Sequence, residues 1–235
     1  MLRAERHRKI LSFLEENNFL DTQAATKLLD SSLATVRRDF SYLEAKGEIT
    51  RIHGGAKLIE KDQIEFSFSE KLNRSMTAKR KIAKKAASLV PDRVCLYLDA
   101  GTTTLQMVDL LPKNVKIVTN SVNIAHQALT QDLRTILIGG EIKKSTDAMI
   151  GPITLNQLKQ FHFGLSFIGI NGVCDQFGYT TPDPEEAIVK QQALIQSDQS
   201  YFLADQSKME QKFLAKVADL KDYPLITEKI KKEQQ

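Results

Sequence analysis

The chain has 235 residues, 42% of them hydrophobic and 26% charged, which is typical of a globular protein able to bury more than one core. Its net charge of +4 and isoelectric point near 8.9 are compatible with an anionic partner but too mild to indicate nucleic acid by themselves. We find no apolar run of spanning length and no basic-then-apolar leader, so we expect a cytoplasmic protein with no membrane partner.

The first predicted elements are two short helices. Residues 5–17 carry apolar side chains at helical spacing: Ile10, Leu11, Phe13 and Leu14. The second helix starts after Asp21, a good N-cap, and its apolar residues are Ala24, Ala25, Leu28 and Leu29.

The third predicted helix has both ends marked. The Ser32 hydroxyl is suited to an N-cap, and Gly47 is suited to a left-handed closing position. At about 100° per residue, one side gathers the residues expected to face a core: Leu33, Val36, Phe40 and Leu43. The opposite side is small, hydroxyl-bearing and cationic, with Arg37 on its flank: Ala34, Thr35, Arg38, Ser41 and Tyr42.

This outer face is typical of a DNA-recognition helix. An isolated Arg-Arg pair more often lies on a solvated helix, but three short helices with a tight turn before the third form a helix-turn-helix. Residues 48–58 then alternate and turn at Gly54-Gly55, as a two-stranded wing would, which places Arg51, His53 or Lys57 near phosphates. We therefore predict that double-stranded operator DNA is bound by Ser32, Thr35, Arg37, Arg38, Ser41, Tyr42, Arg51 and His53.

A polar stretch follows, which we interpret as a linker over residues 59–76 with a helical segment toward Asn73. It runs into a basic cluster: Lys71, Arg74, Lys79, Arg80, Lys81, Lys84 and Lys85. A second nucleic-acid patch is one interpretation. A solvated helix face is favoured, because a conventional apolar stripe lies beneath it: Ile82, Ala83, Ala86 and Leu89.

Beyond the linker, short apolar runs alternate with helical patterns. The runs that we expect to be buried strands are residues 94–98, 115–119, 135–138, 165–170 and 201–204. The segments between them are long enough for crossover helices, which predicts an α/β domain with a largely parallel sheet. In such sheets ligands bind at the carboxyl ends of the strands.

The residues that follow these strands are suited to a phosphate-bearing ligand. After the first strand, residues 99–104 lead into a helix, where Gly101 permits close backbone approach and three threonines offer hydroxyls. An ordinary capped helix start is an equal alternative for this loop alone. It is neither a Walker A loop nor GxGxxG, so nucleotide binding is not supported. Other strand ends add glycines, amides, hydroxyls and one lysine: residues 119–121, 139–141, 169–172 and 205–208.

Motifs in both halves resemble the DeoR family of bacterial sugar-catabolism repressors. The N-terminal resemblance is carried by residues 32–40, Gly47 and residues 51–56; the C-terminal one by the strand ends and by residues 178–182 with Glu185, Glu186 and Lys190. It implies a winged helix-turn-helix domain at 1–58 and, at 77–235, an α/β domain similar in fold to ribose-phosphate isomerase that binds a sugar phosphate. It further implies effector contacts by Asp99, Gly101, Thr102, Thr103, Thr104, Asn120, Gly140, Glu185, Lys190 and Lys208.

One recognition helix and one wing make a small interface, and specific regulators usually join two half-sites by dimer symmetry, so we expect at least a homodimer held mainly by the α/β domain. The resemblance makes fructose 1-phosphate, tagatose phosphates and glycerol 3-phosphate the first effectors to screen. One departure from the family pattern is Gly164, which follows Phe161-His162-Phe163 where we expect an Asp. If Gly164 replaces that carboxylate, one acceptor for a sugar hydroxyl is missing.

Two other functions compete with a repressor. A sugar-phosphate isomerase fused to a DNA-binding module would need a general base, for which the candidates are Asp99, Glu185, Glu186 and Asp205. A repressor needs only ground-state binding, and a fold does not imply its chemistry, so we favour a regulator that is not an enzyme. An RNA-binding module would lack the usual aromatic stacking platform.

The two cysteines, Cys95 and Cys174, are far apart and have no CxxC spacing, and the four histidines are scattered. This pattern indicates neither a disulfide framework nor a zinc site. We expect no metal or other cofactor, and we expect both cysteines to be buried as small hydrophobic residues.

Overall fold

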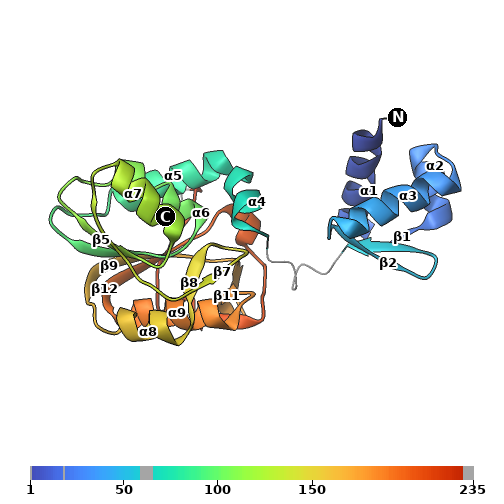
Figure 1. The fold of residues 1–235 in the computed structure, drawn as a ribbon. Helices are drawn as coiled ribbons and strands as arrows, with labels where there is room; N and C mark the ends of the chain where they lie inside the picture. Colours follow the sequence, from blue (N-terminus) through green and yellow to red (C-terminus); the bar gives the residue numbers. More distant parts are fainter. Residues whose placement is uncertain (1, 18, 59–65, 230–235) are drawn as a thin grey trace, which may run out of the picture. The chain divides into compact units, whose positions relative to one another are not determined.

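The computed structural model describes residues 2–17, 19–58 and 66–229, and the chain divides into two compact units, residues 1–64 and 65–235 (Figure 1). Residues 59–65 of the expected linker lie outside the described residues. The helical segment expected near Asn73 is helix α4 (Phe68–Asn73), which has a capping box between Ser67 and Glu70.

The N-terminal unit combines helices with a small antiparallel sheet of strand order β1-β3-β2. Its described elements are α1 (Arg3–Asn17), β1 (Phe19–Asp21), α2 (Thr22–Leu29), α3 (Leu33–Ala45), β2 (Ile49–Ile52) and β3 (Gly55–Leu58). The predicted wing is the β2–β3 hairpin. Strand β1 was not predicted, because three residues are too few for a pattern, and its extended form depends on pairing with β3.

The predicted helix ends are confirmed. The Asp21 carboxylate accepts the backbone amides of Gln23 and Ala24 at 2.8 and 3.1 Å, and the Ser32 hydroxyl accepts that of Thr35 at 3.3 Å. Gly47 follows α3 with φ +69°, the left-handed conformation that closes a helix.

The core prediction for α3 needs two corrections. Val36, Phe40 and Leu43 are buried, but Leu33 is 41% exposed, because it is the first residue of the helix and projects beyond the core. Asp39, which the apolar pattern does not include, is buried at 2% exposure.

The second unit is an α/β domain built on a six-stranded sheet of order β14-β12-β9-β4-β5-β6, in which every described strand pair is parallel. Its strands are β4 (Cys95–Leu98), β5 (Lys116–Thr119), β6 (Arg134–Leu137), β9 (Phe163–Gly169), β12 (Ser197–Leu203) and β14 (Leu225–Ile226). The predicted fold class, a helix-turn-helix unit followed by an α/β domain with a largely parallel sheet, is confirmed.

Helices cover both faces of this sheet (Figure 1). They are α5 (Met76–Ala87), α6 (Thr102–Leu105), α7 (Val122–Thr130), α8 (Gly151–Leu158) and α9 (Pro184–Ile195), with 3₁₀ turns η2 (Val108–Leu110) and η3 (Gln206–Lys208). Leu96 and Leu98 pack into one core with residues of α5 and α7, whereas Tyr97 packs into the other with residues of α8 and α9. Successive strand residues alternate between faces, so a continuous apolar run fills both cores.

Two smaller sheets accompany the main one. The hairpin of β7 (Glu141–Lys143) and β8 (Ala148–Ile150) follows β6, and a second antiparallel sheet contains β10 (Gly172–Cys174), β11 (Gly178–Thr181) and β13 (Ala215–Ala218). Both begin after strands of the main sheet end, so they surround its carboxyl edge.

The structure corrects the interpretation of Gly164. This residue is near the amino end of β9, about 16 Å from Gly169 along an extended strand of about 3.3 Å per residue. A β-carbon on Gly164 would meet the Val94 side chain at 2.7 Å. Glycine is therefore needed for close packing here, and a carboxylate at this position would not reach the carboxyl edge.

The prediction that the basic cluster forms a solvated helix face is wrong for Lys79. Lys79 is only 4% exposed, while Arg74, Arg80, Lys81 and Lys84 are exposed. Lys79 is three residues before Ile82 in α5, so it shares the apolar side of the helix.

Both cysteines are half-buried instead of buried. None of the described helices is long and apolar enough to cross a membrane.

Candidate functional site

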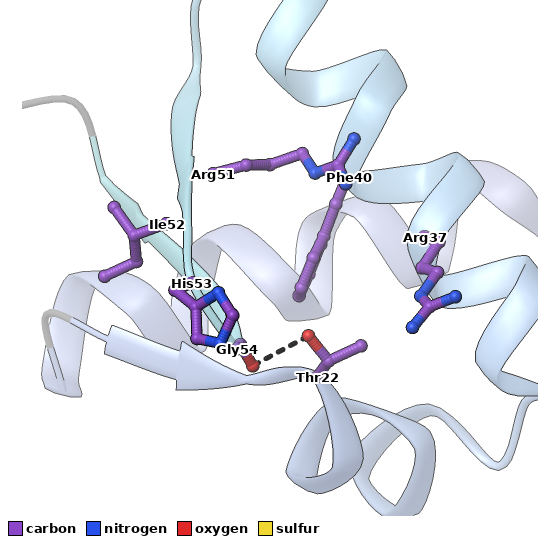
Figure 2. A pocket seen from close by; sticks show the side chains of 8 residues that line it. Thr22, Arg37, Phe40, Arg51, Ile52, His53 and Gly54 are labelled. Carbon is purple, nitrogen blue, oxygen red and sulfur yellow. Dashed lines mark hydrogen bonds between the residues drawn. The ribbon is translucent and has the colours of Figure 1, made fainter.

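The exposed side of α3 and the wing form a cationic surface on the N-terminal unit. Arg37 and Arg38 are both exposed. A hollow of about 370 Å³ separates α3 from the turn of the wing (Figure 2), and it is lined by Thr22, Arg37, Phe40, Arg51, Ile52, His53, Gly54 and Gly55. The Thr22 hydroxyl donates to the Gly54 carbonyl at 2.8 Å, which ties the start of α2 to the turn. Two guanidinium groups beside a hollow suit a phosphate-bearing backbone.

The recognition helix and the wing are joined by a residue that was expected to contact DNA. The Arg51 guanidinium donates to the Ser41 hydroxyl at 2.8 Å, and the Arg51 amide donates to the Glu44 carboxylate at 3.0 Å. Ser41 and Arg51 therefore bond to each other across the predicted DNA surface. The Thr35 and Ser32 hydroxyls likewise share a hydrogen bond of 2.9 Å at the start of α3.

Tyr42 and Asp39 attach α3 to α1. The Tyr42 ring stacks on His7, and the Arg3 guanidinium lies 3.9 Å from its centre. Asp39 accepts hydrogen bonds from Arg6 Nε at 2.6 Å and pairs with His7 Nε2 at 3.0 Å. Burial raises the pKa of Asp39, but its bonds to Arg6 and His7 outweigh burial and hold the pKa below the usual value.

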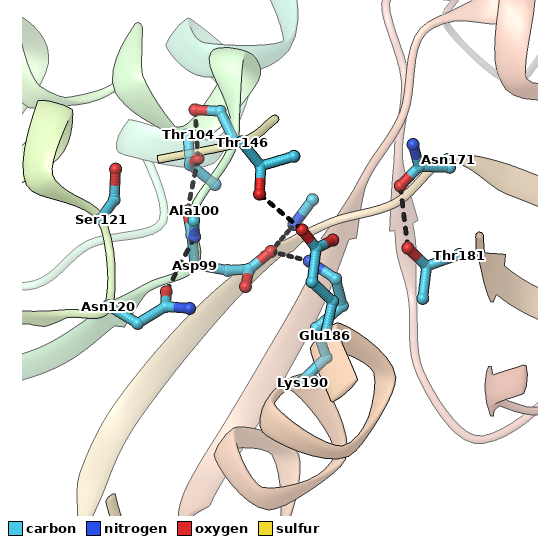
Figure 3. Close-up of polar contacts among 12 residues, drawn as sticks. Asp99, Ala100, Thr104, Asn120, Ser121, Thr146, Asn171, Thr181, Glu186 and Lys190 are labelled. Atoms are coloured by element: carbon cyan, nitrogen blue, oxygen red, sulfur yellow. Dashed lines mark hydrogen bonds and ion pairs between the residues drawn. The ribbon is translucent and has the colours of Figure 1, made fainter. Parts of the chain in front are cut away.

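A buried ion pair marks the carboxyl edge of the main sheet (Figure 3). Asp99 directly follows β4, is 1% exposed, and accepts from Lys190 Nζ of α9 at 2.5 Å and from the Gly169 amide at 3.0 Å. Burial raises the pKa of the Asp99 carboxyl, against the opposing effect of the Lys190 ammonium. The structure thus brings together two predicted effector residues that are 91 positions apart.

Two other predicted effector contacts, Asn120 and Thr104, use their side chains in hydrogen bonds within the protein. The Asn120 side-chain oxygen accepts from the Tyr97 hydroxyl at 2.9 Å and from the Ala100 amide at 3.0 Å, while its nitrogen donates to the Met149 carbonyl. The Thr104 hydroxyl donates to the carbonyls of Asp99 and Gly101 at 2.7 and 2.8 Å. These side-chain bonds hold the 99–104 loop in shape.

The remaining predicted contacts are distributed around the edge. Thr102 and Thr103 are buried in the four-residue helix α6, and Gly101 precedes them. Gly140 has φ +154°, and a β-carbon there would meet the Thr154 hydroxyl at 2.0 Å, so close packing against α8 requires glycine. Glu185 is exposed in the first turn of α9, outside the buried network.

The buried carboxylate of α9 is Glu186, which the site prediction did not include. Its Oε1 accepts from the Thr146 hydroxyl at 2.7 Å and from Lys143 Nζ at 3.3 Å. Burial raises the pKa of Glu186, but Lys190, Lys143 and Thr146 together lower it below its usual value. Its spacing of four residues from Lys190 was the available signal, whereas nothing in the sequence pointed to Lys143.

A group of cations lies around α5 and η3. Lys79 interacts electrostatically with Asp205, Lys208, Lys71 and Arg74, and its ammonium donates to the Lys71 carbonyl. Burial lowers the pKa of Lys79 to about 8. Helices α4 and α5, which carry Lys71 and Lys79, both pack against α6, the helix formed by the end of the 99–104 stretch. The helical phase of Lys79 with Ile82 was the sequence signal for its burial.

The arrangement favours binding over isomerisation. Asp99 is the most enclosed of the proposed general bases, and its Oδ2 is already held by Lys190 and Gly169. Within residues 2–17, 19–58 and 66–229, no group of three or more His, Cys, Asp or Glu side chains is placed to hold a metal ion.

Comparisons with known proteins cover both units. A family profile described as "DeoR-like helix-turn-helix domain" matches residues 6–62, and one described as "DeoR C terminal sensor domain" matches residues 74–229. The chain is 40% identical over 229 residues to "Uncharacterized HTH-type transcriptional regulator FruR" of Bacillus subtilis, covering 97% of this chain and 91% of that protein.

Another relative and a solved structure are also similar to the chain. "Lactose phosphotransferase system repressor" of Staphylococcus epidermidis is 35% identical over 214 residues, covering 89% of this chain and 85% of that protein. The structure of ribose 5-phosphate isomerase A from Methanocaldococcus jannaschii aligns with a TM-score of 0.41 and 16% identity, covering 56% of this chain and 53% of that one.

Proposed function

Because the chain belongs to the DeoR family of transcriptional repressors, we propose that it controls a sugar-catabolism or sugar-uptake operon in the cytoplasm and leaves its operator when a sugar phosphate binds. The chain is a regulator and not an enzyme. In the proposal, residues 1–58 bind double-stranded operator DNA, residues 59–76 link, and residues 77–235 bind the effector and join the subunits.

The cations beside the 99–104 loop are the observation that carries the effector proposal. The charged groups that act on Lys79 include the cations Lys71, Arg74 and Lys208 and the Asp205 carboxylate, so positive charge gathers there. A phosphate dianion is attracted to such a group and accepts hydrogen bonds from ammonium groups and backbone amides. We place the phosphate between Lys208 and the loop at Gly101.

The sugar would then extend toward Asp99 and Lys190. A sugar hydroxyl both donates and accepts, so it suits a carboxylate beside an ammonium. The staphylococcal relative is named for a lactose phosphotransferase system, which supports a sugar-linked effector. The compounds to test are fructose 1-phosphate, tagatose 6-phosphate and glycerol 3-phosphate.

The testing experiment is a titration of operator affinity with each compound, for the wild type, Lys208→Ala and Gly101→Val. A β-carbon on Gly101 would already meet the Thr104 hydroxyl at 3.0 Å, so valine also narrows the loop. We expect the effector to weaken operator binding of the wild type roughly 5- to 150-fold, the usual range of allosteric coupling. Both variants should bind the operator but fail to release it.

Lys81→Ala is the matched control, because it removes the same charge from the exposed side of α5. It should release the operator like the wild type. A thermal-shift measurement gives direct binding, since a ligand at about 100 times its Kd adds about 2.7 kcal/mol to the free energy of unfolding. Equal release by all variants would place the effector elsewhere, and no release of the wild type by any of the three compounds would refute a sugar-phosphate inducer among them.

A further inference from the structure

The β7–β8 hairpin is held against α9 by charged side chains. Lys143, at the end of β7, lies 2.6 Å from the Asp183 carboxylate and 3.3 Å from that of Glu186. Thr146, in the turn of the hairpin, donates to the same Glu186 oxygen at 2.7 Å. We call these four residues, Lys143, Thr146, Asp183 and Glu186, the hairpin clamp.

The clamp is continuous with the buried ion pair at the carboxyl edge. Glu186 and Lys190 are four residues apart on α9, and the Lys190 ammonium is among the charges that lower the pKa of Glu186. Lys190 in turn holds Asp99 at 2.5 Å. Charges of alternating sign thus run from the hairpin to the 99–104 loop, in surroundings where Glu186, Lys190 and Asp99 are all less than 10% exposed.

The hairpin turn also contacts the start of α4. The Ser145 carbonyl accepts the Phe68 amide at 2.7 Å, and Phe68 is the first residue of that helix. Ser67 and Glu70 form the capping box there, and the Arg74 guanidinium lies 3.8 Å from the centre of the Phe66 ring. In sequence, α4 is the first described helix after the DNA-binding unit.

We propose that the hairpin clamp couples the effector site to α4 and thereby to the chain segment that leads to the DNA-binding unit. The inference rests on the proposed function. In the proposed pose the phosphate lies at Gly101, two residues after Asp99, and the sugar hydroxyls reach Asp99 and Lys190. In a low-dielectric interior both change the balance of attraction on Lys190. Because Lys190 also attracts the Glu186 carboxylate, a change at Lys190 alters how strongly Glu186 holds Lys143 and Thr146. The hairpin turn then shifts, and with it the hydrogen bond from the Phe68 amide to the Ser145 carbonyl.

Lys143 and Thr146 are positioning residues in this scheme, because they act through Glu186 and Ser145. Their substitution should separate coupling from binding. In Lys143→Met and Thr146→Val, operator Kd without ligand and effector Kd should stay within about threefold of the wild type, while release by the effector should fall below about twofold from a usual range of about 5- to 150-fold. Lys143→Arg and Thr146→Ser keep the charge and the hydroxyl, so both should retain wild-type release.

The experiment measures operator Kd and effector Kd of each full-length variant, with fructose 1-phosphate, tagatose 6-phosphate and glycerol 3-phosphate in parallel. Lys144→Met is the control, since Lys144 is the neighbouring exposed lysine of the same hairpin turn. It should behave as the wild type. Release of the operator by Lys143→Met and Thr146→Val to the same extent as the wild type would overturn the proposal.

Amide exchange over residues 67–73, measured without any ligand, tests the clamp separately from the proposed function. Loss of the clamp should speed exchange of this segment severalfold in Lys143→Met and Thr146→Val but not in Lys144→Met. Unchanged exchange would show that the clamp does not hold α4 and would reject the inference. A wild type that responds to none of the three compounds would instead refute the proposed effector, a result visible before any variant is compared.

Discussion

Arg37 and Arg38 are adjacent in α3 but have different surroundings. Arg37 lines the hollow next to the wing, whereas Arg38 does not line it and is on the side opposite Val36, Phe40 and Leu43. Arg37 therefore suits a phosphate, and Arg38 suits the edge of a base in the major groove.

The prediction that follows concerns sequence specificity. Arg38→Ala should lose about 1 to 3 kcal/mol of affinity for the cognate operator and relax the preference at one base position. Arg37→Ala should weaken binding to all sequences alike and reduce the salt dependence by about one counterion. Binding to a set of single-base operator variants at two salt concentrations checks both. An unchanged specificity profile for Arg38→Ala would contradict its assignment.

The adjacent residues Glu185 and Glu186 have opposite surroundings, although they differ by one position in α9. Glu185 was predicted to contact the effector, and Glu186 was considered only as a possible base, but Glu185 is exposed and Glu186 is buried in the hairpin clamp. Successive helical residues point about 100° apart, so a motif that places both cannot say which one faces inward until the position of α9 against the sheet is known.

At the scale of elements, α1 and α3 are joined by a partly buried ion pair. Asp39 of α3 is bonded to both Arg6 and His7 of α1. The recognition helix therefore depends on α1 for its orientation, and the stability of this junction depends on the ionised form of Asp39.

Asp39→Asn should destabilise the N-terminal unit by about 1 to 3 kcal/mol at pH 7, since it removes the charged carboxylate that accepts hydrogen bonds from Arg6 and pairs with His7. The folded-state pKa of Asp39 lies below the ordinary 3.8, so its contribution is present above that pH and is lost as the pH falls through the lowered value. The difference between variant and wild type in urea unfolding should thus shrink below about pH 4. Asp30→Asn, at an exposed left-handed position after α2, should show no such difference. A difference independent of pH would refute the ionic role.

For the whole molecule, one α3 helix and one wing offer a small surface for DNA. Specific regulators of this kind usually read two half-sites through the symmetry of a dimer. We therefore expect at least a homodimer held mainly by the α/β unit. In such an oligomer several subunits would respond to the effector together, which makes the release of DNA a steeper function of effector concentration.

We expect light scattering of the full chain at micromolar concentration to give at least twice the monomer mass, and operator affinity to fall when dilution dissociates the oligomer. Operators with one half-site scrambled should bind much more weakly than the intact site. A monomer that retains full operator affinity would contradict this prediction.

The sequence by itself determined the local elements. The N-caps Asp21 and Ser32, the closing Gly47, the wing at Gly54-Gly55 and the apolar runs of the main sheet depend on short-range geometry, which residue type and spacing encode directly. It also located the strand ends, which parallel strands bring to one edge of the sheet, and binding of a ligand there stays a prediction. The individual DNA and effector contacts among those residues stay predictions.

The tertiary structure alone decided which of these residues meet. The strand order β14-β12-β9-β4-β5-β6 differs from chain order, so the partners of Asp99, Lys143 and Glu186 come from elements that the local pattern cannot pair. The same holds for β1, whose extended form depends on pairing with β3, and for Gly164, whose place at the amino end of β9 removes it from the carboxyl edge of the sheet. Burial of Lys79, Asp39 and Glu186 followed the same rule: a charge is stable inside only where partners from distant segments compensate the loss of water, and those partners are assembled by the fold.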